Sequence, residues 1–182
     1  MMEHIDLRYP IGKALEQPFS KDCYNENVKA EYLSAIQQCP ALLKNSISNL
    51  DEMQLNVPYR NGGWTPKQVI HHVADSHLNG YIGFKLVLTE DNPAIKTYKE
   101  AAWAELSDSK NLPVNISLTL LHALHLRWHD LMKNMRDEDW QKTLYHPEYK
   151  REMTLWDLIE TYAWHGKHHV AHITSLRKRK VW

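Results

Sequence analysis

The segment that decides the fold is Thr154–Arg179, which reads TLWDLIETYAWHGKHHVAHITSLRKR. Thr154 is a good helix N-cap, and Asp157 stands three residues later, where a capping partner belongs. We therefore expect a helix to begin after Thr154 and to continue through the histidine-rich stretch to about Arg179.

This expected helix concentrates histidine. Four of the 12 histidines of the protein fall within the eight positions 165–172. On a helix, His165 and His169 form an i, i+4 pair on one face, and His168 and His172 form a second pair. Helical metal sites use this spacing to direct two imidazole nitrogens at one ion.

Three more segments have the apolar spacing of helices. A proline inside the first of them, Pro40, predicts a kink or a break there. The second begins with Thr65, Pro66 and Gln68, which form a capping-box sequence with proline at the first helical position. The three segments are approximately 25–50, 65–89 and 115–135.

No strand pattern competes with these helices, so we predict an all-α fold, a four-helix bundle. Its 182 residues form a single domain, residues 1–182, with an irregular N-terminal segment at 1–22. Residues 91–112 are expected to form a long loop with a short helical turn, and loops of this length in compact domains are usually functional. Residues 137–152 are expected to form a second loop.

The composition of the chain indicates which classes of partner to expect. The formal net charge is zero with neutral histidines, so we expect no nucleic-acid partner. No apolar run has the roughly 18 residues of a membrane span, and the N-terminus lacks the order of a signal peptide. The two cysteines, Cys23 and Cys39, do not form a CxxC pair. We expect reduced thiols, with Cys39 in a core, and a cytoplasmic protein with no membrane partner.

Two histidines on one helix are too few for a catalytic metal site, which usually has three protein ligands and one open position. The other two histidine-bearing helices could each supply the third ligand, and spacing alone does not choose between them. The candidates are His71, His72 and His77 on one helix, and His122, His125 and His129 on the other.

Several segments resemble the DinB-like proteins. The segment Gly63–His77, GWTPKQVIHHVADSH, resembles the first signature of that family, and Trp164–His169, WHGKHH, resembles the second. Further stretches are similar to its YfiT-like branch, so the resemblance covers nearly the whole chain. These stretches are DLRYPIGK at Asp6–Lys13, NPAIK at Asn92–Lys96, AAWAEL at Ala101–Leu106 and LHLRW at Leu124–Trp128.

The resemblance implies a ligand set. The family's first ligand stands eight residues after the tryptophan, which is His72 here, and its last two are the i, i+4 pair His165 and His169. A set that uses His168 or His172 is the alternative. Otherwise these two histidines are candidates for contacting the ligands or the substrate.

Other polar residues receive simpler interpretations. Asp75 follows His72 by three residues and could accept the second N–H of His72 or the proton of a bound water. His71 is expected to pack beside the ligand helix, and His122, His125 and His129 to serve packing or an interface. We expect His4, His77 and His146 to be solvated or in loops.

The resemblance implies a metal-dependent hydrolase. Three neutral imidazoles suit Zn or Ni, and such an ion lowers the pKa of a bound water from 15.7 to about 7. The branch is also related to bacillithiol transferases, in which the metal would hold a small thiol as thiolate, so the expected small-molecule substrate could be a thiol. A metal-stabilised binding module without catalysis is the third hypothesis. The resemblance also implies a homodimer.

Overall fold

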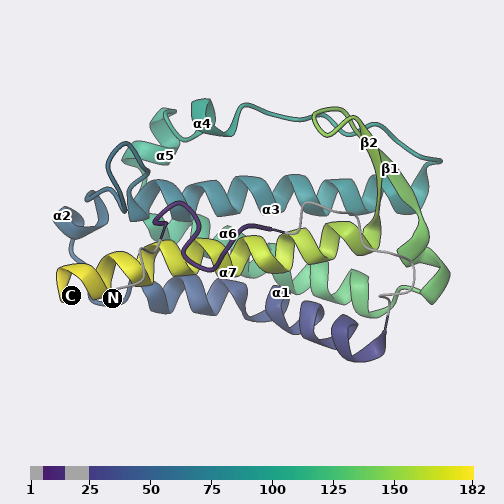
Figure 1. Cartoon of the computed structure of the whole chain (residues 1–182), viewed down its shortest axis with the longest axis horizontal. Coiled ribbons are helices and arrows are strands. Elements are labelled where there is room, and N and C mark those ends of the chain that lie inside the picture. The colour runs from purple at the N-terminus through teal and green to yellow at the C-terminus, as the bar shows by residue number, and fades with distance from the viewer. Residues whose placement is uncertain (1–5, 15–24) are drawn as a thin grey trace.

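The computed structural model describes residues 6–14 and 25–182 of the chain. Four long helices run side by side along the molecule (Figure 1). They are α1 (Glu26–Ser46), α3 (Pro66–Thr89), α6 (Val114–Lys133) and α7 (Leu155–Lys180). The prediction of a mainly helical, four-helix bundle is confirmed, and so are the approximate positions of all four helices.

Shorter elements connect the long helices. Three are helical turns and one is a 3-10 helix, and two short strands form a hairpin before α7. They are α2 (Glu52–Leu55), α4 (Glu100–Trp103), α5 (Ser107–Asn111), η2 (Asp137–Gln141), β1 (Thr143–His146) and β2 (Arg151–Thr154).

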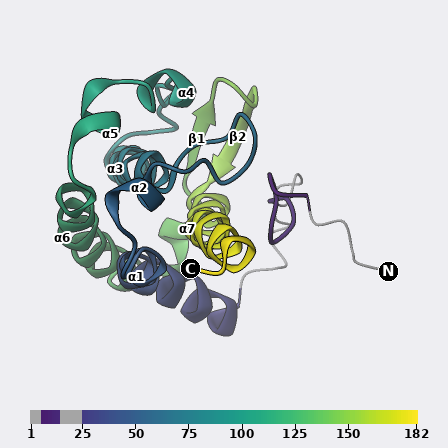
Figure 2. The same cartoon turned by 90° about the vertical axis from the view of Figure 1, so that its left-hand side faces the viewer.

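The order of the helices around the bundle is not the order of the sequence. Each of α1 and α3 packs against both α6 and α7, so α1 lies diagonally opposite α3 (Figure 2). In Figure 1, α3 and α6 run in one direction while α1 and α7 run in the other. Because α3 and α6 are parallel neighbours, the connection between them must return along the whole bundle. This requirement explains the length of the 91–112 segment.

Two capping boxes fix where α3 and α7 begin. The Thr65 hydroxyl accepts from the backbone N–H of Gln68, and the Gln68 side chain accepts from the backbone N–H of Thr65. Thr154 and Asp157 make the same pair of bonds at the start of α7. Each box satisfies two N–H groups that a helix end would leave unpaired. Both sequence predictions are confirmed.

Pro40 does not break α1, although a break was one of the two predicted outcomes, the other being a kink. The helix continues from Glu26 to Ser46 with Pro40 buried inside it. Proline has no N–H, so the carbonyl of Ile36, four residues earlier, lacks its usual helical donor. Another donor compensates for this loss, since the His125 ring nitrogen Nδ1 lies 2.6 Å from the Ile36 oxygen.

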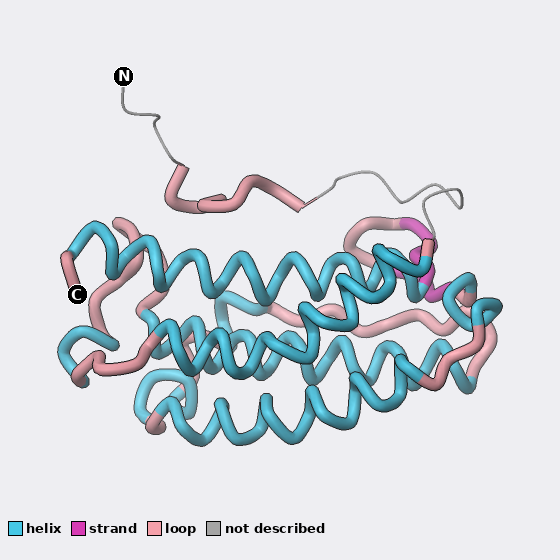
Figure 3. Tube along the Cα trace, turned by 90° about the horizontal axis from the view of Figure 1, so that it is seen from below, coloured by secondary structure: helices cyan, strands magenta, loops and turns pink. Residues whose placement is uncertain are grey.

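The prediction that residues 137–152 form a loop was wrong. Strands β1 and β2 pair antiparallel in this region (Figure 3). Leu144 and Met153 face each other in the register and are buried, whereas their neighbours Tyr145 and Glu152 are exposed. Four-residue strands are too short for this alternation to stand out in the sequence, and the hairpin is stabilised by packing on the bundle.

The core consists of two apolar clusters. One is rich in aromatic residues and includes Phe84, Trp128 and Ile159. The other is aliphatic and includes Leu43, Val73 and Ile173. Along α3, α6 and α7 the buried histidines stand near the positions where one cluster gives way to the other. The bundle therefore contains a polar layer across its middle.

Two other findings bear on the sequence expectations. Cys39 is a buried free thiol, as expected, while Cys23 and His4 lie outside the described residues. No helix in the described part of the chain combines the length and apolarity that a membrane span requires.

The close packing of α1 on α7 gives a first prediction. A Cβ atom added at Gly166 would lie 2.8 Å from Cys39 Sγ, too close for two buried helices without a shift. We expect Gly166→Ala to lower the free energy of unfolding by about 1–3 kcal/mol, the usual cost of overpacking a core, in urea denaturation.

Gly83→Ala is the matched control, because its Cβ would meet only Ile95 Cγ2 at 4.0 Å. It should keep or slightly raise stability, since alanine is the better helix former. Equal stability of the Gly166→Ala variant and the parent protein would contradict the packing argument.

Candidate metal centre

Three ring nitrogens converge between α3 and α7. His72 Nε2 lies 3.2 Å from His165 Nε2, and His169 Nε2 lies 3.1 Å from the same atom. His165 and His169 stand one turn apart on α7, and both face His72 on α3. The structure thus brings together the three residues that the family resemblance selected, and leaves the other candidates of the sequence outside this group.

The spacing of the nitrogens suits a transition-metal ion. Metal–nitrogen bonds of 2.0–2.1 Å in tetrahedral geometry place two ligand nitrogens about 3.3 Å apart. Moreover, three Nε2 atoms facing one point cannot all satisfy one another, because a neutral ring has only one N–H. A cation at that point would accept all three lone pairs.

Two neighbouring features orient this cluster. The Trp64 ring, immediately before the N-cap of α3, lies 4.5 Å from the His72 ring between centroids. On the other side, His172 Nδ1 lies 3.4 Å from His169 Nδ1, and His172 Nε2 lies 3.1 Å from the Arg8 carbonyl oxygen. A carbonyl can only accept, so His172 donates to Arg8 and accepts from His169.

His168 and Asp75, the other two residues expected to lie beside the ligands, make no hydrogen bond to them. His168 is buried and stacks on Trp164 at 4.2 Å between centroids, and its Nδ1 has no partner within the described part of the chain. Asp75 is half-buried, and burial raises its pKa to about 6. No hydrogen bond joins Asp75 to His72, although both residues are described. The proposed proton role of Asp75 stays a prediction.

The expectation that His77 is solvated was wrong. His77 is fully buried, and its two nitrogens lie 2.9 Å from His125 Nε2 and 3.1 Å from His165 Nδ1. His125 is buried as well, while His122 is exposed and His129 half-buried. The i, i+3, i+7 spacing therefore does not place the three histidines of α6 in one environment.

His71 is buried beside the site without joining it. Its Nδ1 lies 2.7 Å from the Ser117 hydroxyl, and its Nε2 lies 3.1 Å from the Leu112 carbonyl oxygen. It therefore ties α3 to α6 and to the segment before it, which agrees with the expected packing role.

One carboxylate lies close to the converging nitrogens. His72 and His169 are buried, while His165 is half-buried and keeps part of its surface exposed. Glu100 on α4 places Oε2 3.9 Å from His72 Nε2, and its side chain is 62% exposed. Partial burial, with Glu148 nearby, raises the pKa of Glu100. No fourth His, Cys, Asp or Glu among the described residues completes the group.

Burial keeps the histidines of the centre neutral. It lowers the pKa of His72 to about 4 and holds the pKa values of His165 and His169 well below the usual value of 6.5, with neighbouring histidines adding to the effect. Imidazole must be neutral to bind a metal. The surroundings of the three histidines therefore favour the metal-binding, neutral form at neutral pH.

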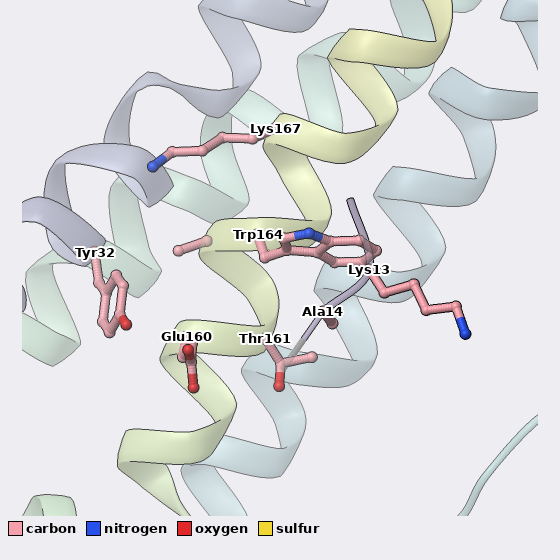
Figure 4. A pocket seen from close by; sticks show the side chains of 8 residues that line it. Lys13, Ala14, Tyr32, Glu160, Thr161, Trp164 and Lys167 are labelled. Atoms are coloured by element: carbon pink, nitrogen blue, oxygen red, sulfur yellow. The ribbon is translucent and has the colours of Figure 1, made fainter. Parts of the chain in front are cut away.

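A separate cavity of about 230 Å³ lies on the outer face of α7. Figure 4 shows Glu160, Thr161 and Trp164 of α7 around it, with Lys167 one turn further along. Burial raises the pKa of Glu160 to about 7. None of the three converging histidines lines this cavity. The cavity is therefore separate from the candidate metal site.

Comparison with known proteins agrees with this geometry. A family model described as the DinB superfamily matches residues 35–173, a span that contains all three converging histidines.

The chain belongs to the DinB superfamily.

Several members of this superfamily are close relatives. A Bacillus cereus (strain 03BB102) protein named "Putative metal-dependent hydrolase" is 52% identical over 178 residues, which cover 97% of this chain and 99% of the relative. A Bacillus anthracis (strain CDC 684 / NRRL 3495) protein of the same name is 51% identical over the same shares. The relatives are thus named for metal-dependent hydrolysis, and the histidine cluster of this chain fits a metal site.

A solved structure shares the whole fold. YfiT from Bacillus subtilis superposes with a TM-score of 0.91 at 43% identity, covering 97% of this chain and 98% of that one. It is described as "a probable metal-dependent hydrolase with an unusual four-helix bundle topology". The resemblance to the YfiT-like branch is therefore confirmed.

Sequence reasoning missed Glu100, His77 and His125. Glu100 lies in the 91–112 connection, whose length indicated a functional loop without indicating which residue reaches the site. His125 had one available signal, since Pro40 removes a donor from α1 and buried carbonyls require partners.

Metal content tests the convergence directly. We expect the purified protein to bind one equivalent of Zn²⁺ or Ni²⁺, and His165→Ala to abolish stoichiometric binding because two imidazoles remain. Isothermal titration calorimetry measures both. His122→Ala, which removes an exposed histidine of α6, is the control and should keep the equivalent. Equal binding by the two variants would overturn the ligand assignment.

The buried histidines also predict a pH dependence for the metal-free protein. Their pKa values are lower in the folded chain than in the unfolded one, so below pH 6.5 the unfolded chain binds more protons. The contribution of these histidines to the free energy of unfolding is therefore complete above about pH 6.5 and is lost as the pH falls towards 4. The loss is up to about 1.4 kcal/mol per pH unit for each such histidine. Urea unfolding at pH 7, 6 and 5 measures this.

Glu160, Asp75 and Glu100 act in the opposite direction, because their raised pKa values let the folded chain bind extra protons as the pH falls. The histidines with lowered pKa values outnumber these carboxyl groups, so we expect net destabilisation on acidification. A stability that is constant or rises from pH 7 to 5 would contradict the buried, neutral state of the histidines.

Proposed function

We propose that the protein is a hydrolase that uses one divalent transition metal, held by His72, His165 and His169, with Glu100 as the group that moves the proton. The observation that carries the proposal is the convergence of the three Nε2 atoms, with His165 Nε2 3.2 and 3.1 Å from the other two, close to a carboxylate. Zn or Ni is the expected ion because all three donors are imidazole nitrogens.

A divalent ion held by neutral ligands keeps its full charge, and it supplies the Lewis acidity needed to hydrolyse a carbonyl compound at neutral pH. The protein contributes by keeping the ligands neutral. The lowered pKa of His72, caused mainly by burial, prevents protons from competing for its Nε2 atom near pH 7. The rigid helices α3 and α7 fix the positions of the three nitrogens.

Glu100 is placed to accept a proton from the attacking water. Its Oε2 lies 3.9 Å from His72 Nε2, so a water held at the three nitrogens would be within its reach. Its raised pKa moves its basicity towards neutral pH, where a general base is most effective. Because α4 belongs to the crossing segment 91–112, the topology of the bundle brings this carboxylate over the site.

The lack of a fourth protein ligand among the described residues favours catalysis over a purely structural metal site. Structural zinc sites are usually closed by four protein ligands. Here the described residues supply three, and His165 is half-buried. This feature supports an enzyme more than a metal-stabilised binding module.

Glu100→Gln tests the proposal. In the metal-loaded protein we expect it to lower kcat for chromogenic ester and anilide substrates by about 10²–10⁴-fold, the usual contribution of a general base, with unchanged metal content. Glu105→Gln is the matched control, because Glu105 lies on the same connection but pairs with Lys110 and Gln68. Equal loss in both variants would contradict a specific role for Glu100.

The same protein loaded with Co²⁺ distinguishes hydrolysis from thiol transfer. We expect turnover with water alone and no thiolate–cobalt charge-transfer band on titration with cysteine or glutathione. A strong band, together with no turnover across the ester and anilide panel, would overturn the hydrolase proposal and favour a thiol S-transferase.

A further inference from the structure

We propose that His77 and His125 are positioning residues which fix the tautomer of His165 through a hydrogen-bonded relay that starts at the Ile36 carbonyl. The inference rests on the proposed role of His165 as a metal ligand. It goes beyond that role, because it assigns a function to two buried histidines and to a proline that do not touch the converging nitrogens.

The relay starts at Pro40. A residue with an N–H at position 40 would donate to the carbonyl of residue 36 in a regular helix, and proline cannot. The Ile36 oxygen is thus a buried acceptor without its helical donor. Because a carbonyl has no proton to give, any group bonded to it must be a donor.

His125 is that donor. Its Nδ1 lies 2.6 Å from the Ile36 oxygen, so Nδ1 carries the ring proton. His125 is 2% exposed, and burial lowers its pKa to about 4, so the ring is neutral and has one N–H only. Its Nε2 must therefore accept.

His77 has the same arrangement, donating through Nδ1 and accepting through Nε2. Its Nδ1 lies 2.9 Å from His125 Nε2, and because His125 Nε2 accepts, His77 Nδ1 must donate. His77 is 0% exposed, so a second, charged proton on its ring would be costly. The remaining nitrogen, His77 Nε2, is thus an acceptor as well.

The last link sets the state of the metal-facing residue. His77 Nε2 lies 3.1 Å from His165 Nδ1, so His165 Nδ1 donates and His165 Nε2 is left with its lone pair free. This is the nitrogen that meets His72 and His169. One missing N–H on α1 therefore determines, through three rings on α6, α3 and α7, which nitrogen of His165 can bind an ion.

The second ligand of α7 has a shorter relay of the same polarity. His172 Nε2 donates to the Arg8 carbonyl, so His172 Nδ1 accepts from His169 Nδ1 and leaves His169 Nε2 free. Each relay thus ends at a backbone carbonyl, a usual outer partner for a metal-binding histidine. One histidine, His172, stands between His169 and its carbonyl, whereas two, His77 and His125, stand between His165 and its carbonyl.

A second metal ion at Cys39, His77 and His125 is the competing explanation, since one donor atom of each lies within 4.8 Å of the others. The hydrogen bonds argue against it. Both nitrogens of His77 and both of His125 already have partners at 2.6–3.1 Å. Burial also raises the pKa of the Cys39 thiol to about 12, which opposes the thiolate that a metal requires.

Nitrogen-15 NMR of the imidazole rings tests the relay in the metal-free protein at pH 7.5. We expect His125, His77 and His165 all to carry their proton on Nδ1, with resonances assigned by loss in single variants. A His165 or His77 ring protonated on Nε2 would overturn the proposal. This readout does not depend on catalysis, so a failure of the hydrolase proposal would leave it interpretable.

Metal affinity, measured by competition with a chelator, tests the consequence. His77→Leu removes the acceptor of His165 Nδ1, and we expect Zn²⁺ binding to weaken 10–100-fold, as for other losses of an outer hydrogen bond. His77→Gln should restore most of this affinity, because an amide can accept from His165 through its oxygen and donate to His125 through its NH₂.

His71→Leu is the matched control. It removes another buried histidine of α3, bonded to Ser117 and Leu112, and should destabilise the fold without changing Zn²⁺ affinity. Equal weakening by His71→Leu and His77→Leu would show a general packing effect and overturn the relay. A second Zn²⁺ equivalent that disappears in Cys39→Ser would also overturn it in favour of the competing metal site.

Discussion

The structure depends on a constraint on buried neutral imidazole, which must donate at one nitrogen and accept at the other. A histidine in the middle of a bundle can meet this requirement only if a fixed acceptor or donor stands at the end of the chain of contacts. Here the Ile36 and Arg8 carbonyls are those fixed ends. The polar layer between the two apolar clusters is consequently ordered, and the free lone pairs of His165 and His169 point to one place.

The helix order also brings a carboxylate to this layer. Because α3 and α6 are parallel neighbours, the chain must cross the bundle between them, and the crossing segment carries Glu100 to the edge of the histidine cluster. The diagonal placement of α1 and α3 also lets α6 stand between them, so that His125 can contact both Ile36 and His77. Topology and chemistry are therefore linked, and a simple up-down-up-down order would separate these groups.

Much of this could be predicted from sequence because the relevant signals are local. The capping boxes at Thr65 and Thr154 fix helix starts within one turn, and i, i+4 spacing puts His165 and His169 on one face. The choice of His72 over His71 came from family resemblance, since adjacent helical residues differ only in which neighbour they face. His77 and Glu100 could not be found in this way, because burial and reach across the bundle depend on how the helices pack.

The placement of the three converging histidines has one more consequence. His72 and His165 lie far apart in the sequence, on helices whose packing closes only in the folded chain, so the unfolded chain offers no comparable site. An ion bound there would therefore favour the folded state by mass action, by about 2.7 kcal/mol when its free concentration is a hundred times the dissociation constant. The lifetime of the protein in a cell would then depend on how much free metal the cell maintains.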